Sequence, residues 1–220
     1  MRLAVRVYLA GLFVLEGAER VPREGGLLVC SNHASTMDPP LVPAVLPRSD
    51  SWSMAKSEYF ARPSFTSWLF SHYHAFPVVR HSADRKALKR AQQILREGHV
   101  LILYPEGTRV ESGGLRRAEP GAGFLARSNP APVQPVGLIG TRNCFPRGAR
   151  WPRRVPVRVR FGIPFRILDR RPDGRRVENQ DAADSIMLAI ADLLPKEMRG
   201  AYEEVDDNRR RELEGIRELA

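Results

Sequence analysis

The 220-residue chain is 43% hydrophobic and 27% charged, which suits one domain of ordinary size with a sizeable buried core. Its two cysteines, Cys30 and Cys144, exclude a disulfide framework and a cysteine-based metal site. No stretch reaches the roughly 18 consecutive apolar residues of a membrane-spanning helix, so we expect none.

Charge is unevenly distributed along the chain. The formal net charge is +10, but residues 142–176 hold twelve arginines against Asp169 and Asp173, whereas residues 177–220 carry a net charge of −6. We call residues 142–176 the basic band. Such a band attracts anionic lipid surfaces, nucleic acid or an acidic carrier protein, or is simply a solvated face of an arginine-rich protein. Nucleic acid is not expected, because no nucleic-acid-binding signature accompanies the band.

The first element along the chain is the apolar segment 1–15, which contains Arg2 and Arg6. A signal peptide is not expected, because no small-residue cleavage site follows and the next residues are charged. We expect instead a short helix or strand that lies against the core or at a membrane interface.

Strands and helices then alternate. Apolar runs predict buried strands at 27–30, 52–55, 76–79, 100–104 and 133–139, and an apolar–polar alternation predicts a half-exposed edge strand at 155–161. Apolar positions at helical spacing predict helices at 58–73 (one or two, broken near Pro63), 82–97, 121–128 and 182–194. This alternation predicts an α/β fold with a largely parallel central sheet flanked by helices on both faces.

No linker divides the chain, so we expect a single domain at residues 16–195. It follows the short segment 1–15 and precedes a charged stretch at residues 196–220. The high charge of this last stretch predicts a frayed helix or tail.

The first motif that carries chemistry begins where the strand at 27–30 ends. Histidine is a residue type that can accept a proton from a hydroxyl at working pH, so His33 can act as a general base. Asp38, five residues later, can curl back to orient its ring. Asn32 immediately precedes the base at the strand end. The alternative interpretation is that Asp38 only caps the helix that begins near Pro39 and that His33 is an ordinary loop residue.

The second motif, Glu106-Gly107-Thr108-Arg109, follows the buried strand at 100–104. It therefore lies at the carboxyl edge of the sheet, where α/β proteins usually carry their sites. Gly107 permits a tight turn, Thr108 adds a hydroxyl donor, and Arg109 can grip a phosphate with two parallel hydrogen bonds. We expect Glu106 to hold Arg109 in place or to bind a substrate hydroxyl. The alternative is a surface turn with an Arg–Glu pair.

Two further cations follow predicted strands. Arg80 ends the strand at 76–79, and in a parallel sheet it lies at the same edge as Arg109, where two guanidinium groups predict a dianion site. The alternative for Arg80 is an ordinary surface residue. Lys56 follows the strand at 52–55 and is expected to support the site or to lie on the surface.

Taken together, these stretches resemble the glycerolipid acyltransferases, specifically the 1-acylglycerol-3-phosphate acyltransferase-like family. Asn32, His33 and Asp38 match its N-H-x-x-x-x-D block, and residues 106–109 match its E-G-T-R block without change. Residues 76–80 and 133–137 are similar to its two apolar strand blocks. The resemblance extends from Glu16 to Phe165.

The resemblance implies an acyltransferase in which His33 is the general base and Asp38 its orienter. Residues 106–109 and Arg80 would bind the glycerol phosphate of a lysophospholipid, and the acyl thioester of coenzyme A or acyl carrier protein would be the co-substrate. No metal or other cofactor is implied. The protein would act as a peripheral enzyme at the cytoplasmic side of an anionic membrane.

Two alternatives stay open from the sequence. The first keeps the mechanism but changes the acceptor to another lysolipid or an amino-acid lipid. The second is a non-catalytic module that binds anionic membranes through the basic band.

Overall fold

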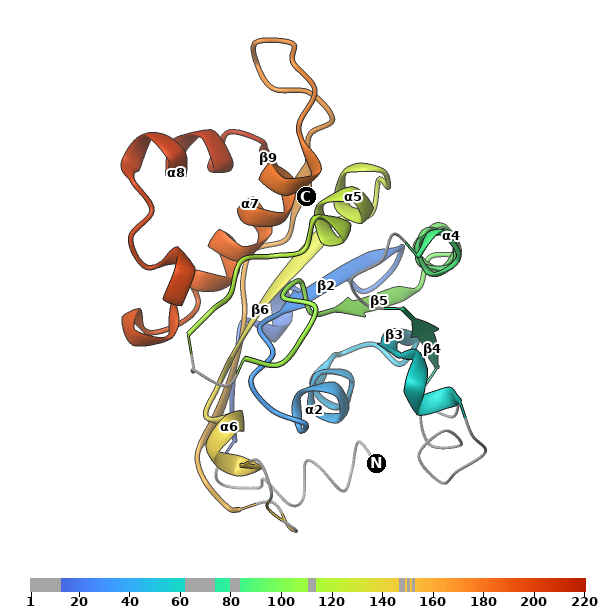
Figure 1. The fold of residues 1–220 in the computed structure, drawn as a ribbon, viewed down its shortest axis with the longest axis vertical. Helices are drawn as coiled ribbons and strands as arrows, with labels where there is room; N and C mark the ends of the chain where they lie inside the picture. Colours follow the sequence, from blue (N-terminus) through green and yellow to red (C-terminus); the bar gives the residue numbers. More distant parts are fainter. Residues whose placement is uncertain are drawn as a thin grey trace.

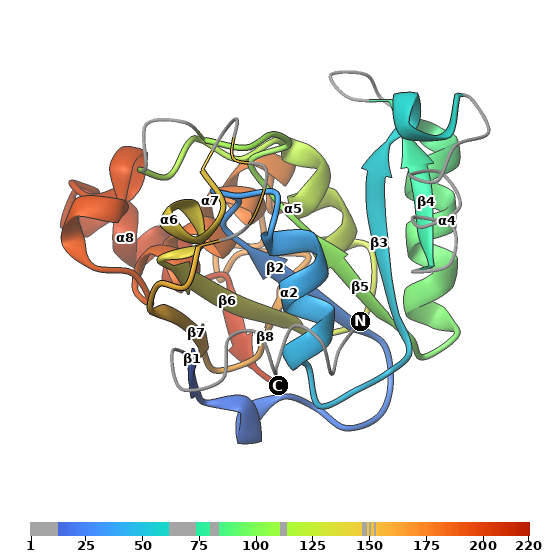
Figure 2. The same ribbon diagram turned by 90° about the horizontal axis from the view of Figure 1, so that it is seen from below.

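The computed structural model describes residues 13–61, 74–79, 84–110, 114–146, 149, 151 and 153–220. Within these residues the chain builds one nine-stranded sheet with the order β1-β7-β6-β2-β5-β3-β4 (Figures 1 and 2). Strand β8 pairs with β6, and β9 pairs with β8. The strands are β1 Phe13–Glu16, β2 Leu27–Ser31, β3 Ser51–Lys56, β4 Ala75–Val78, β5 Val100–Leu103, β6 Val133–Ile139, β7 Val157–Phe161, β8 Phe165–Ile167 and β9 Arg217–Leu219.

The helices are α2 Asp38–Val45, α4 Arg85–Arg96, α5 Pro120–Arg127, α6 Thr141–Cys144, α7 Asn179–Ala191 and α8 Asp207–Glu214. Short 3₁₀ turns lie at Ala18–Arg20 (η1), Ser57–Phe60 (η2), Lys196–Met198 (η3) and Gly200–Tyr202 (η4). None of the helices in these ranges is both long enough and apolar enough to cross a bilayer.

The centre of the sheet is parallel, as predicted. Strands β6, β2, β5, β3 and β4 all run in one direction. Strand β7 is antiparallel to β6, β1 is parallel to β7, and β8 and β9 add antiparallel pairs. The carboxyl ends of the parallel strands therefore meet at one edge, where the predicted site residues follow them.

One strand differs in position from the prediction. The alternation at 155–161 is confirmed, since Val157 and Val159 are buried and Arg158 is exposed. However, β7 is not an edge strand, because β1 pairs along its outer side from Phe13 to Glu16. Residues 1–12 lie outside the described residues, so only the end of the expected N-terminal segment is described, and it is part of the sheet.

Successive residues of β2 face opposite cores, which shows how the helices cover the sheet. Leu28 and Cys30 pack with the helices α4, α5 and α7, and Leu27 and Val29 pack with α2 and with Cys144 of α6. The two views agree with this arrangement, with α2 on one side of β2 and α5 and α7 on the other (Figures 1 and 2). The expected two-sided α/β architecture is confirmed.

The C-terminal stretch is more ordered than a frayed helix or tail. Leu213 of α8 and the following Ile216 are buried in the body of the protein. Strand β9 pairs with β8, with Arg217 opposite Ile167. A few apolar residues among many charged ones anchor this segment. The prediction of a tail rested on the high charge of the whole stretch and did not take these single apolar residues into account. Most of the helical region predicted at 58–73 lies outside the described residues.

Candidate active site

The loop between β2 and α2 is fixed at its start by Asn32. The Asn32 side chain accepts a hydrogen bond from Leu138 N (2.7 Å) and donates one from Nδ2 to Leu138 O (3.0 Å). These bonds continue the contact between β2 and β6 one residue beyond the last paired position, Ser31. Asn32 therefore anchors the loop that carries the base.

His33 and Asp38 meet as the sequence predicts. His33 Nδ1 lies 2.8 Å from Asp38 Oδ2, and the two side chains are 8% and 0% exposed. The same oxygen accepts hydrogen bonds from Ala34 N (2.8 Å) and Ser35 N (2.7 Å). Nδ1 thus donates to the carboxylate, which leaves Nε2 as the nitrogen available to a substrate.

Asp38 does not cap its own helix. The N-cap of α2 is Met37, whose side chain makes no capping hydrogen bond, and Asp38 is the first helical residue. Its carboxylate points back to the loop, so the simple capping interpretation is wrong, and the orienting interpretation accounts for its contacts.

Glu106 has a different role from the one expected. Its Oε1 accepts from His33 N and its Oε2 from Arg116 N, both at 2.9 Å, and the residue is 3% exposed. Val110 N also donates to His33 O (2.9 Å). Because backbone amides occupy both carboxylate oxygens, Glu106 does not hold Arg109 but fixes the backbone of the base. The alternative interpretation, a surface turn in which Glu106 pairs with Arg109, is wrong for the same reason.

The remaining residues of the second motif form the predicted turn. Gly107 N donates to Tyr104 O (3.0 Å), and Gly107 has a φ of 67°, a conformation that favours glycine. Thr108 is half-buried, and Arg109 is exposed without an ion pair to another described residue. Arg109 immediately precedes Val110, whose amide is bonded to His33 O, so the exposed guanidinium can bind an anion near the base.

Arg80 lies outside the described residues, so its place at this edge stays a prediction. Lys56 ends β3 at the same edge, but its Nζ pairs with Glu58 Oε1 at 2.8 Å and the Lys56 side chain is 40% exposed. The contacts of Lys56 are those of a surface residue.

Sequence reasoning missed Tyr104, whose ring stacks on His33 with centroids 4.3 Å apart and an interplanar angle of 26°. Burial, together with the charge of Asp38, raises the pKa of Tyr104 well above its ordinary value, so its hydroxyl stays protonated. The signal was present in the alternation along β5, since Val100 and Ile102 share the α2 face with Tyr104.

Glu106 gives the fold a distinctive pH dependence. Burial raises its pKa from 4.5 to about 7. Between these values the unfolded chain ionises while the folded protein keeps the proton, so the contribution of Glu106 to stability falls as pH rises. The limit of this loss is about 3 kcal/mol, reached above pH 7.

We therefore expect Glu106→Gln, which does not titrate, to lower the free energy of unfolding more at pH 5 than at pH 8. Urea denaturation of both proteins at the two pH values measures this difference. Glu24→Gln, at an exposed position, is the control and should give the same small change at both. An equal effect of Glu106→Gln at pH 5 and pH 8 would contradict the raised pKa.

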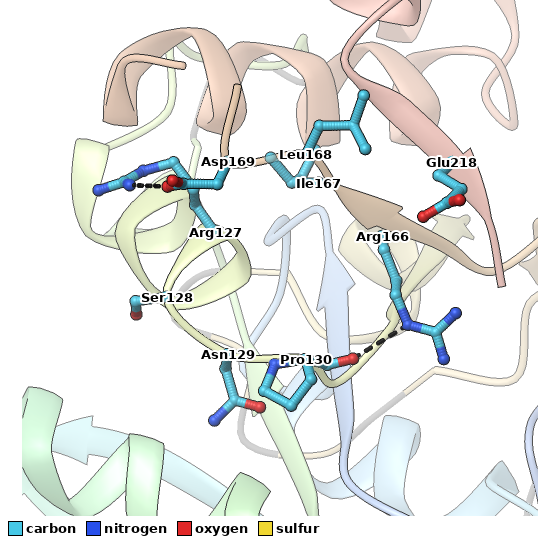
Figure 3. Close-up of a pocket in the computed structure, with 9 residues that line it drawn as sticks. All are labelled: Arg127, Ser128, Asn129, Pro130, Arg166, Ile167, Leu168, Asp169 and Glu218. Carbon is cyan, nitrogen blue, oxygen red and sulfur yellow. Dashed lines mark hydrogen bonds and ion pairs between the residues drawn. The ribbon is translucent and has the colours of Figure 1, made fainter. Parts of the chain in front are cut away.

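An open hollow of about 410 Å³, whose lining residues Figure 3 shows, includes neither His33 nor Asp38 in its lining. It is lined by Arg127 to Pro130, Arg166 to Asp169 and Glu218. Residues 127–130 precede β6, so the hollow is at the amino edge of the parallel strands, opposite His33. Arg127 pairs with Asp169 (2.6 Å), and Arg166 Nε donates to Pro130 O (3.1 Å). These contacts do not connect it with the catalytic chemistry.

The basic band is partly neutralised within the fold. Arg158 and Arg160 pair with Glu16 at 3.2 and 2.8 Å, and Arg171 pairs with Asp181. The band is therefore not one continuous cationic face. Its section after α6 lies beside the catalytic loop, because Ser35 Oγ donates to Phe145 O (3.4 Å).

The family model and the relatives that match this chain are acyltransferases. A family model described as Acyltransferase matches residues 13–139. The chain is 31% identical to the 1-acyl-sn-glycerol-3-phosphate acyltransferase of Bacillus subtilis over 63% of this chain and 68% of that protein. It is 25% identical to the probable 1-acyl-sn-glycerol-3-phosphate acyltransferase of Mycoplasma pneumoniae over 84% of this chain and 72% of that protein.

A solved structure shares the fold. The crystal structure of the 1-acyl-sn-glycerophosphate acyltransferase PlsC from Thermotoga maritima matches with a TM-score of 0.69 and 24% sequence identity. The match covers 86% of this chain and 73% of that chain.

Proposed function

Since the chain belongs to the acyltransferase family, we propose that it moves a fatty acyl group from a thioester to the free hydroxyl of 1-acylglycerol-3-phosphate, giving phosphatidic acid. The observation that carries this proposal is the buried His33–Asp38 pair, joined at 2.8 Å and placed next to a turn that ends in the exposed Arg109. A base beside an anion-binding arginine suits an acceptor that carries both a hydroxyl and a phosphate.

The reaction needs one proton shuttle. His33 Nε2 accepts the hydroxyl proton as the acceptor oxygen attacks the thioester carbonyl, and the Asp38 carboxylate stabilises the resulting imidazolium. Collapse of the tetrahedral intermediate breaks the C–S bond, and the imidazolium returns the proton to the departing thiolate. The ester and the free thiol are the products.

This route uses no acyl-enzyme. Cys30 lies within β2 and is fully buried on the face covered by α4, α5 and α7. Burial also raises the pKa of its thiol far above the ordinary value, so it is no nucleophile at neutral pH. Direct attack by the acceptor is therefore the mechanism that the described residues support.

Arg109 would bind the acceptor phosphate. We expect Arg109→Ala to raise the KM for lysophosphatidic acid by roughly 10–100-fold with little change in kcat, because a charge-assisted hydrogen bond contributes about 1.5–3 kcal/mol. Arg109 is exposed, so the free energy of unfolding should not change. Initial rates at varied acceptor concentration test this.

The control for Arg109 is an acceptor without phosphate. The KM for a monoacylglycerol should be the same in Arg109→Ala and in the wild-type enzyme. Arg96→Ala, at an exposed position at the end of α4, should leave the KM for lysophosphatidic acid unchanged. An unaltered KM for lysophosphatidic acid in Arg109→Ala would contradict the assignment.

The acyl donor in this proposal is the thioester of coenzyme A or acyl carrier protein, with no metal or other cofactor. The enzyme would work as a peripheral protein at the cytoplasmic face of an anionic membrane. Exposed Arg142 and Arg153, together with Trp151 at 81% exposure, supply the cations and the interfacial aromatic side chain that such a surface attracts.

Product identity tests the proposal. Purified protein is incubated with palmitoyl-coenzyme A or palmitoyl-acyl carrier protein and with lysophosphatidic acid, another lysolipid or an amino-acid lipid, and the products are identified by mass spectrometry. We expect phosphatidic acid to form fastest. Preferred acylation of another acceptor would contradict the assignment of 1-acylglycerol-3-phosphate as the substrate but would agree with the proposed mechanism.

A further inference from the structure

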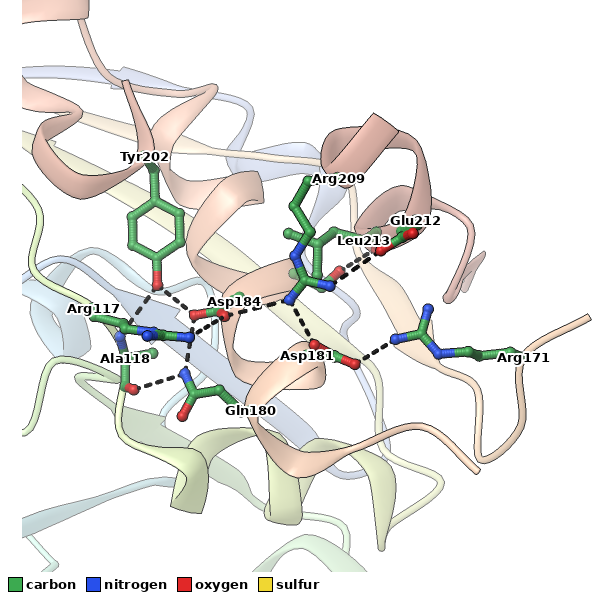
Figure 4. A network of polar contacts seen from close by, with 11 residues as sticks. Arg117, Ala118, Arg171, Gln180, Asp181, Asp184, Tyr202, Arg209, Glu212 and Leu213 are labelled. Carbon is green, nitrogen blue, oxygen red and sulfur yellow. Dashed lines mark hydrogen bonds and ion pairs between the residues drawn. The ribbon is translucent and has the colours of Figure 1, made fainter. Parts of the chain in front are cut away.

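Two buried polar residues outside the family match have no part in the mechanism above. Asp184 of α7 and Tyr202 of η4 are 6% and 5% exposed, whereas the match ends at residue 139. Tyr202 Oη donates to Asp184 Oδ1 (2.8 Å) and accepts from Ala118 N (3.2 Å), as Figure 4 shows. A buried tyrosine–aspartate pair thus holds the backbone of the segment that follows the second motif.

The same segment is held at further points. Gln180 Nε2 donates both to Ala118 O (3.1 Å) and to Asp184 Oδ1 (3.0 Å), so both backbone groups of Ala118 are bound (Figure 4). Leu115 N donates to Met198 O (3.1 Å), and Ala201 N donates to Leu115 O (2.9 Å). We call Gln180, Asp184 and Tyr202 the C-terminal clamp.

The approach of the two backbones requires glycine. A Cβ on Gly200 would lie 2.4 Å from Leu115 O, and one on Gly114 would lie 2.9 Å from Gly200 Cα. Gly200 also has a φ of 48°, in the left-handed region. The chain is built to bring η4 against residues 114–118.

The clamped segment leads directly to the base. Arg116, between Leu115 and Ala118, donates its amide to Glu106 Oε2, and Glu106 Oε1 accepts from His33 N, each at 2.9 Å. If residues 115–118 moved away, one buried oxygen of Glu106 would lose its donor. The position of Glu106 and of the His33 backbone therefore depends on the segment that the clamp holds.

On the basis of the proposed acyl transfer, we propose that Tyr202, supported by Asp184, is a positioning residue for the base. It acts through Ala118, Arg116 and Glu106 on the backbone of His33 and does not touch the substrate. Small displacements of a general base cost about tenfold to a hundredfold in rate, so the loss should appear in kcat while the KM for lysophosphatidic acid is retained.

Tyr202→Phe tests this, because it removes only the hydroxyl and keeps the buried ring. Ser185→Ala is a matched control. Ser185, also buried on α7, donates to Leu213 O (2.6 Å) and accepts from Arg217 Nε (2.8 Å), so this variant also removes one donated and one accepted hydrogen bond. Its bonds do not touch residues 114–118.

The first readout is amide hydrogen exchange and needs no turnover. Tyr202→Phe should speed exchange at His33 N and Arg116 N by at least about tenfold relative to Ser185→Ala, with the core amide of Val29 as the reference for global opening. The second readout is kinetic. We expect kcat to fall about tenfold or more in Tyr202→Phe and to stay within about twofold of wild type in Ser185→Ala.

Equal exchange at His33 and Arg116 in the two variants would overturn the proposal, and so would faster exchange with an unchanged kcat. Absence of turnover in the wild-type protein with any acceptor would instead refute the proposed function. In that case the exchange measurement still decides whether the clamp holds His33.

Discussion

Replacing His33 with alanine is expected to abolish acyl transfer, with kcat falling by at least about 10³-fold. The variant removes the imidazole that is hydrogen-bonded to Asp38, and the buried thiol of Cys30 cannot take over its role. The fold should persist, because the structural bonds of His33 come from its backbone: its N–H to Glu106 and its carbonyl from Val110, both at 2.9 Å. Asp38 would keep its two bonds to Ala34 N and Ser35 N.

The loss must be separated from unfolding. Circular dichroism and urea denaturation of His33→Ala should show a cooperative transition close to that of the wild-type protein. His33→Gln, which retains a polar side chain but cannot act as a base, should be equally inactive. Turnover near the wild-type rate in either folded variant would show that His33 is not the base.

Replacing Asp38 with asparagine is expected to lower kcat by about 10²–10⁴-fold. Asp38 Oδ2 holds all three hydrogen bonds to the loop, whereas Oδ1 is buried with no hydrogen-bond partner in the described part of the chain. An amide can present its oxygen to the three donors and place its NH₂ group at the other position. The geometry should survive while the charge that stabilises the imidazolium is lost.

Comparison of Asp38→Ala with Asp38→Asn separates the effect of the lost charge from the effect of the lost hydrogen bonds. Asp38→Ala removes the acceptor of three hydrogen bonds and should lower the free energy of unfolding by about 1–3 kcal/mol, whereas Asp38→Asn should be milder. The test is to measure kcat and, by urea denaturation, the free energy of unfolding of both variants. Wild-type kcat in Asp38→Asn would mean that the carboxylate only shapes the loop.

The pair at the centre of the site could be predicted from the sequence because it is local. Five residues separate His33 from Asp38, and the apolar run before them indicates a strand that presents the loop at the edge of the sheet. The turn around Gly107 is local too, and its φ of 67° agrees with the glycine there. Features of this kind depend only on residues that are close together in the sequence, so they can be predicted from it.

The role of Glu106 could not be predicted in this way. Its partners are backbone amides 73 residues before it and 10 residues after it, and no side-chain pattern marks a backbone donor. Its nearest charged neighbour in the sequence, Arg109, suggested a pair that the fold does not form. Glu106 is buried, and a buried carboxylate must accept hydrogen bonds from the donors around it, which here are two backbone amides.

Long-range pairing explains the other differences. Strand β1 is only four residues long, and each of its residues pairs with a residue of β7 that lies 144 positions later, as Phe13 does with Val157. No local signal in the sequence links the two strands. The pairing of Glu16 with Arg160 is equally remote in sequence, at a separation of 144 residues. The C-terminal segment is anchored by Tyr202, Leu213 and Ile216, which stand singly among charged residues.

The most direct test of His33 as the general base of an acyltransferase is acceptor-dependent release of free thiol from palmitoyl-coenzyme A. Purified wild-type protein and His33→Ala are assayed in parallel, with and without lysophosphatidic acid. We predict rapid thiol release by the wild-type protein only when lysophosphatidic acid is present, and no release above background in the variant. Equal release by both proteins, or release that does not depend on an acceptor, would contradict this prediction.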